Sequence, residues 1–88
     1  MRSVIVEVKR EDIDAGVRND CDKCPVALAI NRALNVNNVA VYEEGMLDMY
    51  VVGYSGWLIP LPISARDFIV GFDLGHGVDP FSFELVLE

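Results

Sequence analysis

Apolar and polar residues alternate near both ends of the chain. Residues 3–9 and 80–88 each follow this two-residue period, which predicts half-buried β-strands. The side chains expected to face inward are Val4, Val6, Val8, Phe81, Phe83, Leu85 and Leu87. Residues 25–35 and 64–75 instead repeat apolar side chains every three or four positions, which predicts two amphipathic helices.

The middle of the chain carries further strand signals. Residues 38–53 predict two short strands around a Glu-Glu-Gly turn, and residues 54–64 predict another strand after a Gly-containing bend. Pro60 and Pro62 lie two apart in that last strand, so both missing N–H groups face the same side. A neighbouring strand cannot form a regular ladder there, and we therefore expect this strand at a sheet edge.

Together these elements predict the fold class. With an added helical turn at residues 11–16, the order is β-α-β-β-β-α-β, and we expect a single α+β domain over residues 1–88. One-sided strands and amphipathic helices favour a two-layer sandwich, with a mostly antiparallel sheet of about five strands and two helices on one face. The chain is 52% hydrophobic, which is enough for a core in a domain of this size.

The apolar runs of the chain are short. None approaches the roughly 18 residues that cross a bilayer. The apolar stretch near the N-terminus is too short for a signal peptide and has charged residues on both sides. We therefore expect a cytoplasmic protein with reduced thiols.

Charge is unevenly distributed along the chain. Residues 1–32 hold six acidic and six basic side chains, whereas residues 33–88 hold eight acidic side chains and a single basic one, so this second part carries the whole net charge of −7. Such a field repels the phosphates of nucleic acids and anionic lipids, and we expect neither as a partner. It is suited to solubility or to a basic partner.

The only two cysteines, Cys21 and Cys24, lie three apart, directly before the first predicted helix. A thioredoxin-like motif follows the first strand of a βαβ unit closely, whereas here a helical turn and a polar loop intervene. A structural zinc site needs four ligands, and the chain adds only His76 to this pair. We therefore expect no metal or cofactor, with Cys24 buried at the helix start and Cys21 in the loop. A thiol-based redox or metal-binding protein remains the alternative.

Nothing in the sequence forms a catalytic constellation, which favours a non-enzymatic binding protein. Leu28 falls among polar residues on the first predicted helix, which suggests an apolar contact and a homo-oligomer. Acidic residues cluster at the first hairpin turn, where they would meet a basic partner. The candidate binding residues are Leu28, Arg32, Glu43, Glu44, Asp48 and Trp57.

Several short segments resemble a family of small uncharacterised proteins encoded by bacteriophages and prophages. The matching residues are Asp12, Ile13 and Gly16, residues 24–30, Leu61, Pro62, Phe68, Ile69, Phe72, Asp73 and Gly75, and residues 80–85. The resemblance implies a phage accessory protein and no particular reaction. In that setting, the expected partner is a host protein or a small ligand.

Overall fold

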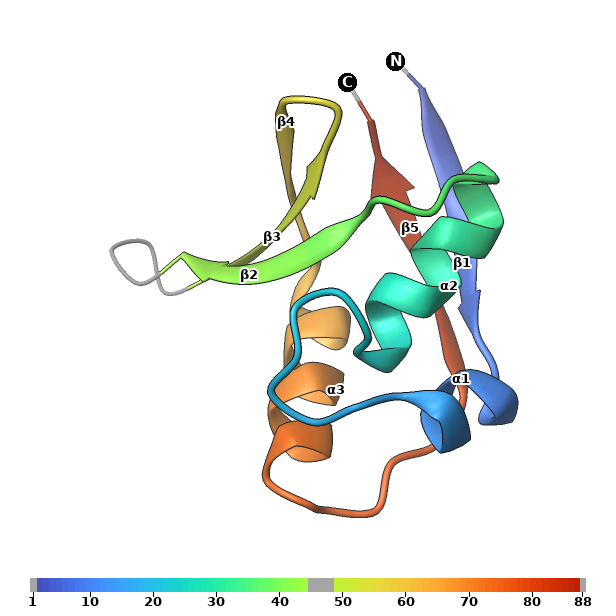
Figure 1. The fold of residues 1–88 in the computed structure, drawn as a ribbon, viewed down its shortest axis with the longest axis vertical. Coiled ribbons are helices and arrows are strands. Elements are labelled where there is room, and N and C mark those ends of the chain that lie inside the picture. Colours follow the sequence, from blue (N-terminus) through green and yellow to red (C-terminus); the bar gives the residue numbers. More distant parts are fainter. Residues whose placement is uncertain (1, 45–48, 88) are drawn as a thin grey trace.

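The computed structural model describes residues 2–44 and 49–87, which form an α+β fold as the sequence predicts (Figure 1). The elements are β1 (Ser3–Val8), α1 (Arg10–Ala15), α2 (Pro25–Leu34), β2 (Ala40–Glu44), β3 (Met49–Tyr54), β4 (Trp57–Pro60), α3 (Ile63–Asp73) and β5 (Phe81–Val86). The predicted helical turn after the first strand is α1. The two longer predicted helices are α2 and α3.

The first and last strands pair with each other. β1 and β5 are antiparallel, with Val6 opposite Phe83 and Val4 opposite Leu85. The N–H of Leu87 continues this ladder by donating to the carbonyl of Arg2 at 2.8 Å, so the two ends of the chain lie close together (Figure 1). The inward faces are those that the alternation predicts, because these side chains are buried or half-buried.

The other three strands form a second antiparallel sheet in the order β2-β3-β4. A two-residue turn joins β3 to β4. Ser55 and Gly56 both have positive φ, 50° and 82°, while Tyr54 lies opposite Trp57. Two positive φ angles make a type I′ turn, whose twist matches that of the strands that it connects.

The prediction of a single sheet is wrong, because the five strands divide between a two-stranded and a three-stranded sheet. The predicted edge position is confirmed, since β4 pairs only with β3 in the described part of the chain. The N–H of Leu61 donates to the carbonyl of Tyr50 at 3.0 Å. Successive residues of a strand face opposite sides, so Pro60 and Pro62 face away from β3. A regular ladder from β4 to a further strand would need the two N–H groups that these prolines lack.

A shared core joins the two sheets. The largest fully buried side chains come from α2 and from both sheets: Ile30, Leu85, Val6, Val8, Val26, Val52 and Pro25. An aromatic cluster closes one end, where Phe68 of α3 packs against Phe81 with ring centroids 4.8 Å apart. Phe83 follows at 5.6 Å from Phe81. Phe68 and Phe83 are buried, which confirms the predicted facing of α3 and β5.

Pro60 in β4 and Pro62 just after it give a testable prediction about the sheet edge. Replacing both Pro60 and Pro62 with Ala restores two N–H donors on the outward edge, which then becomes a template for pairing with another chain. We expect the double variant to self-associate more strongly than the wild type in sedimentation velocity at equal concentration. Pro80→Ala, at an exposed loop proline, is the control and should leave the sedimentation unchanged. A double variant that sediments like the wild type would contradict this role of the prolines.

Candidate binding groove between the two sheets

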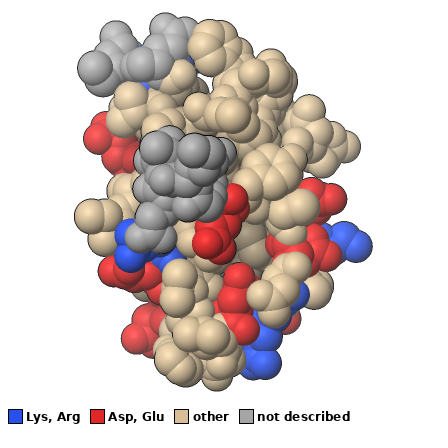
Figure 2. Space-filling model, turned by 90° about the vertical axis from the view of Figure 1, so that its left-hand side faces the viewer, with Lys and Arg blue, Asp and Glu red and all other residues tan. Residues whose placement is uncertain are grey.

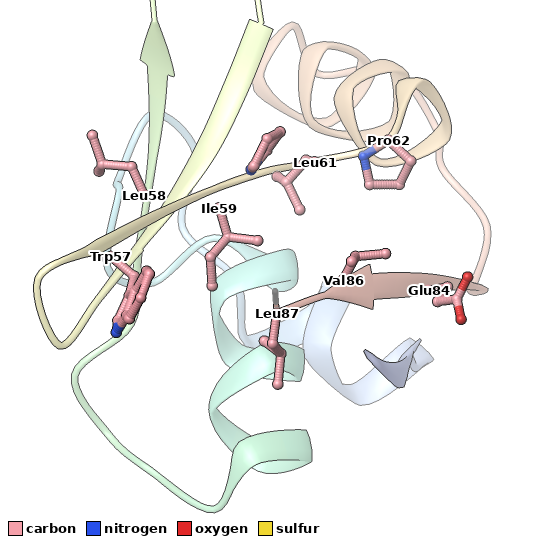
Figure 3. Close-up of a pocket in the computed structure, with 9 residues that line it drawn as sticks. Trp57, Leu58, Ile59, Leu61, Pro62, Glu84, Val86 and Leu87 are labelled. Atoms are coloured by element: carbon pink, nitrogen blue, oxygen red, sulfur yellow. The ribbon is translucent and has the colours of Figure 1, made fainter. Parts of the chain in front are cut away.

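A groove of about 530 Å³ separates β4 from β5 (Figure 3). Residues 57–62 line one side, and Glu84, Val86 and Leu87 line the other. The two strands run in opposite directions on either side of it (Figures 1 and 3). The groove thus lies where an edge strand of one sheet faces a strand of the other sheet.

The side chains around the groove are mostly apolar and unusually accessible. Trp57 is 61% exposed, Leu58 66% and Val86 40%. In Figure 3, Trp57 and Leu87 lie on one side of β4, and Leu58 points to the other side. Large apolar side chains gathered around a concave surface are typical of a binding site.

The lining includes one charged side chain, Glu84. Its carboxylate Oε2 accepts a hydrogen bond from the hydroxyl of Ser3 across the β1–β5 ladder at 2.8 Å. Both side chains lie on the surface of the sheet, so the carboxylate keeps capacity to accept further hydrogen bonds. The groove is therefore an apolar surface with one negative charge.

The main chain of β5 also contributes to the groove. Because the N–H of Leu87 faces β1, the alternation of an antiparallel ladder turns the N–H and carbonyl groups of Ser82, Glu84 and Val86 the other way. In the described ranges β5 pairs with β1 alone. Its outward edge is therefore open on the side where the groove lies.

Of the candidate residues named from the sequence, Trp57 alone lines this groove. Arg32 has a structural role. Its Nη1 and Nη2 donate to the two carboxylate oxygens of Asp12 at 2.7 and 2.8 Å, and Nη2 also donates to the carbonyl of Glu7 at 2.7 Å. The carboxylate of Asp12 also accepts from the N–H of Lys9 at 2.8 Å. Arg32 thus fastens α1 and α2 to the end of β1.

The electrostatic balance at Asp12 follows from these contacts. Burial alone would raise the pKa of its carboxyl group, but the hydrogen bonds from Arg32 and Lys9 and the charge of Arg32 outweigh burial. The pKa of Asp12 therefore lies below its ordinary value. The charged form is the one that the fold stabilises.

Leu28 is half-buried on α2. It lines a cleft of about 570 Å³ together with mostly polar side chains, which include Asn31, Asn37 and Asn38. The apolar contact expected from the sequence is therefore one leucine in a polar setting. The homo-oligomer inferred from it stays a prediction.

β2 and β3, the strands that flank the predicted acidic turn, lie on the opposite side of β4 from the groove. Glu43 is exposed on β2, whereas Asp48 and the side chain of Glu44 lie outside what the structure describes. Figure 2 shows acidic side chains spread over this face with basic side chains among them, and a mostly uncharged surface at its upper right. Burial and then the charge of Glu43 raise the pKa of the nearby Tyr50.

The two cysteines line a smaller cleft, of about 300 Å³, with Asp20, Tyr50 and Asp73. Cys24 is buried and is the N-cap of α2, where its Sγ accepts a hydrogen bond from the N–H of Ala27 at 3.4 Å. Cys21 is exposed. This arrangement confirms that Cys24 is the more buried thiol and begins the helix.

The pKa values of both thiols lie above the ordinary value. Burial raises the pKa of Cys24, and the negative charges of Asp73 and Asp20 raise it further. A hydrogen bond to the carboxylate of Asp22 raises the pKa of Cys21. A redox-active thiol requires the opposite shift, because the thiolate is the reactive form.

The acidic side chains of this cleft hold the loop before α2 in place. One carboxylate oxygen of Asp20 accepts from the N–H groups of Asp22 and Lys23 at 2.9 and 3.0 Å. Asp73 accepts from the N–H of Asn19 at 3.0 Å. Within the described residues, no three His, Cys, Asp or Glu side chains are grouped to hold a metal ion.

Comparison with known proteins gives no relative. No protein family, curated protein or solved structure matches the chain. The phage-protein resemblance therefore stays a prediction. None of the described helices is long and apolar enough to cross a membrane.

The Asp12–Arg32 pair gives a prediction about stability and pH. Asp12→Asn should lower the free energy of unfolding by about 2 kcal/mol at pH 7, because charge-assisted hydrogen bonds are lost. The folded-state pKa lies below the unfolded value of about 3.9, so this stabilisation is present above that pH and is lost as the pH falls through the folded-state pKa. Urea unfolding should therefore show the wild type and the variant converging in strongly acidic solution.

Asp14→Asn is the matched control, since Asp14 is exposed on the same helix. It should change stability by a few tenths of a kcal/mol at most. A difference between the wild type and Asp12→Asn that stays constant down to about pH 2 would show that Asp12 does not act through its charge.

The thiols give a second prediction for this part of the molecule. Iodoacetamide should alkylate Cys21 in the folded protein and reach Cys24 only after unfolding. The rate at Cys21 should rise with pH through a midpoint higher than that of free cysteine in the same buffer, because its pKa lies above the ordinary value. Mass spectrometry of the labelled peptides measures both. Rapid labelling of Cys24 in the folded protein near neutral pH would restore the thiol-based alternative.

Proposed function

We propose that this chain is a non-enzymatic binding protein and that the groove between β4 and β5 holds an apolar segment of its ligand. The observation that carries the proposal is the exposure of Trp57, Leu58 and Val86 around one concave surface. A volume of about 530 Å³ is within the range of roughly 300–1,000 Å³ that is typical of ligand pockets. The partner expected from the sequence, a host protein or a small ligand, fits such a surface.

The charge of the chain supports the same reading. With a net charge of −7 and one carboxylate in the groove, the protein favours neutral or basic ligands over nucleic acids and anionic lipids. We place this activity in the cytoplasm, in the phage accessory setting that the resemblance implies. The raised pKa values of both thiols favour binding over a thiol reaction.

The uncharged dye Nile red tests the groove directly, because its fluorescence rises in apolar surroundings. Val86→Asp should reduce the enhancement at least fivefold, since a carboxylate in the groove disfavours an apolar ligand. Val70→Asp is a matched control, because Val70 is 39% exposed on α3 and Val86 is 40% exposed. Circular dichroism verifies that each variant is folded.

A second pair of variants tests the same groove in case Val86→Asp, on β5, does not fold. Leu58→Asp lies in the groove and Leu74→Asp lies outside it, at 66% and 67% exposure. The proposal predicts that Leu58→Asp lowers the binding of the dye and that Leu74→Asp leaves it unchanged. If the dye binds all folded variants equally, the groove is not the apolar binding site.

A further inference from the structure

The outward edge of β5 provides a complete set of main-chain hydrogen-bonding groups. The N–H and carbonyl groups of Glu84 and Val86, which line the groove, face away from β1, and those of Ser82 next to it face the same way. Such an edge is a template for one more strand. A peptide that adds there would gain affinity from its main chain and specificity from alternate side chains.

The chain itself does not supply that strand. β4 is the nearest candidate, but Pro60 at its end and Pro62 two residues beyond it have no N–H to donate on the outward side. β4 and β5 therefore bound the groove without pairing across it in the described ranges. β4 contributes an apolar wall to the groove, and β5 contributes the open ladder.

The geometry points to an extended, basic peptide segment of a partner protein that binds in the groove as an added strand on β5. This inference rests on the proposed function and names its ligand. Glu84 is the charged side chain of the lining, so a Lys or Arg beside the added strand would meet a negative partner. Apolar side chains of the segment would cover Trp57 on one face and Val86 on the other.

A second copy of the chain is a poorer occupant. Each copy carries a net charge of −7, so two copies repel each other. The edges that a second copy offers are also constrained. Its β5 lies across the groove from its own β4, and on its β1 the carbonyl of Glu7 already accepts a hydrogen bond from Arg32. A flexible segment enters a groove more readily than the edge of a folded domain.

The test begins with a displayed library of random twelve-residue peptides selected on the wild-type protein. The recovered peptides should combine apolar residues with Lys or Arg. They should bind Val86→Asp at least tenfold more weakly than Val70→Asp. Glu84→Gln should also weaken the binding of these peptides. The effect should be larger at low salt, because the charge pair is screened at high salt. Glu7→Gln, at an exposed glutamate on β1, is the control for charge.

Methylation of single peptide nitrogens then separates strand addition from side-chain binding. In an added strand, alternate N–H groups face β5, and methylation at those positions should weaken binding at least tenfold. Methylation at the intervening positions should weaken binding less, because those N–H groups face β4, whose carbonyls can accept but whose Pro60 cannot donate in return, so no regular ladder forms on that side. Equal effects at both sets of positions would overturn strand addition.

The remaining outcomes also distinguish this inference from its alternatives. Selected peptides that are acidic would overturn the proposed partner chemistry. Dimerisation of the wild type that Val86→Asp abolishes would assign the groove to a second copy. If Val86→Asp weakens the binding of Nile red but of none of the selected peptides, strand addition is wrong and the apolar binding site stands. If neither depends on Val86, the proposed function fails as well.

Discussion

Two N–H groups are missing on the outward side of the segment formed by β4 and the two residues after it, and the arrangement of both sheets depends on their absence. Pro60 and Pro62 face away from β3, because the intervening Leu61 donates to β3. A sheet grows when each strand can donate and accept along its whole edge. That condition fails at Pro60, the last residue of β4, and again at Pro62 just beyond the strand. The three-stranded sheet therefore ends there, and β5 pairs with β1 instead.

The groove follows from this constraint. A protein normally fills the space between two strands with hydrogen bonds or with side chains, whereas here the space is left open and apolar. The core beneath it is complete, since the inward residues of both sheets pack on α2 and α3. The exposed side chains around the groove are thus additional to the core. This separation is what favours a binding role for Trp57, Leu58 and Val86.

A second constraint holds the opposite end of the molecule together. Asp12 is the buried charged residue of the described chain, and Arg32 links it to the carbonyl of Glu7. Since three elements meet there, the ion pair fixes α1 and α2 against β1. The end of the molecule that carries the groove has no comparable polar clamp among the described residues. It relies on the β1–β5 ladder and on the turn at Ser55 and Gly56.

Much of the fold could be predicted because local patterns determine it. Alternation predicted β1 and β5, the spacing of Pro60 and Pro62 predicted the edge strand, and Pro25 marked the start of α2, where Cys24 is the buried N-cap. The α+β class followed from the order of the elements.

The division into two sheets could not be predicted, because it depends on which strands meet across the fold. The same limit applies to the candidate site. Trp57 was identified, but Val86 and Glu84 join it only through the packing of β5 beside β4. Arg32 was assigned to binding because its partner, Asp12, lies in another helix that the sequence does not place. A proline pair on one edge was the available signal that a strand beside it would be left unpaired.

The most direct measurement of the central claim is amide hydrogen exchange in the free protein, followed residue by residue with NMR. If β4 and β5 do not pair, the N–H groups of Glu84 and Val86 exchange rapidly, while those of Leu85 and Leu87 are protected by β1. Equal protection at all four positions would show that a strand already occupies the outward edge of β5, and would contradict an open groove.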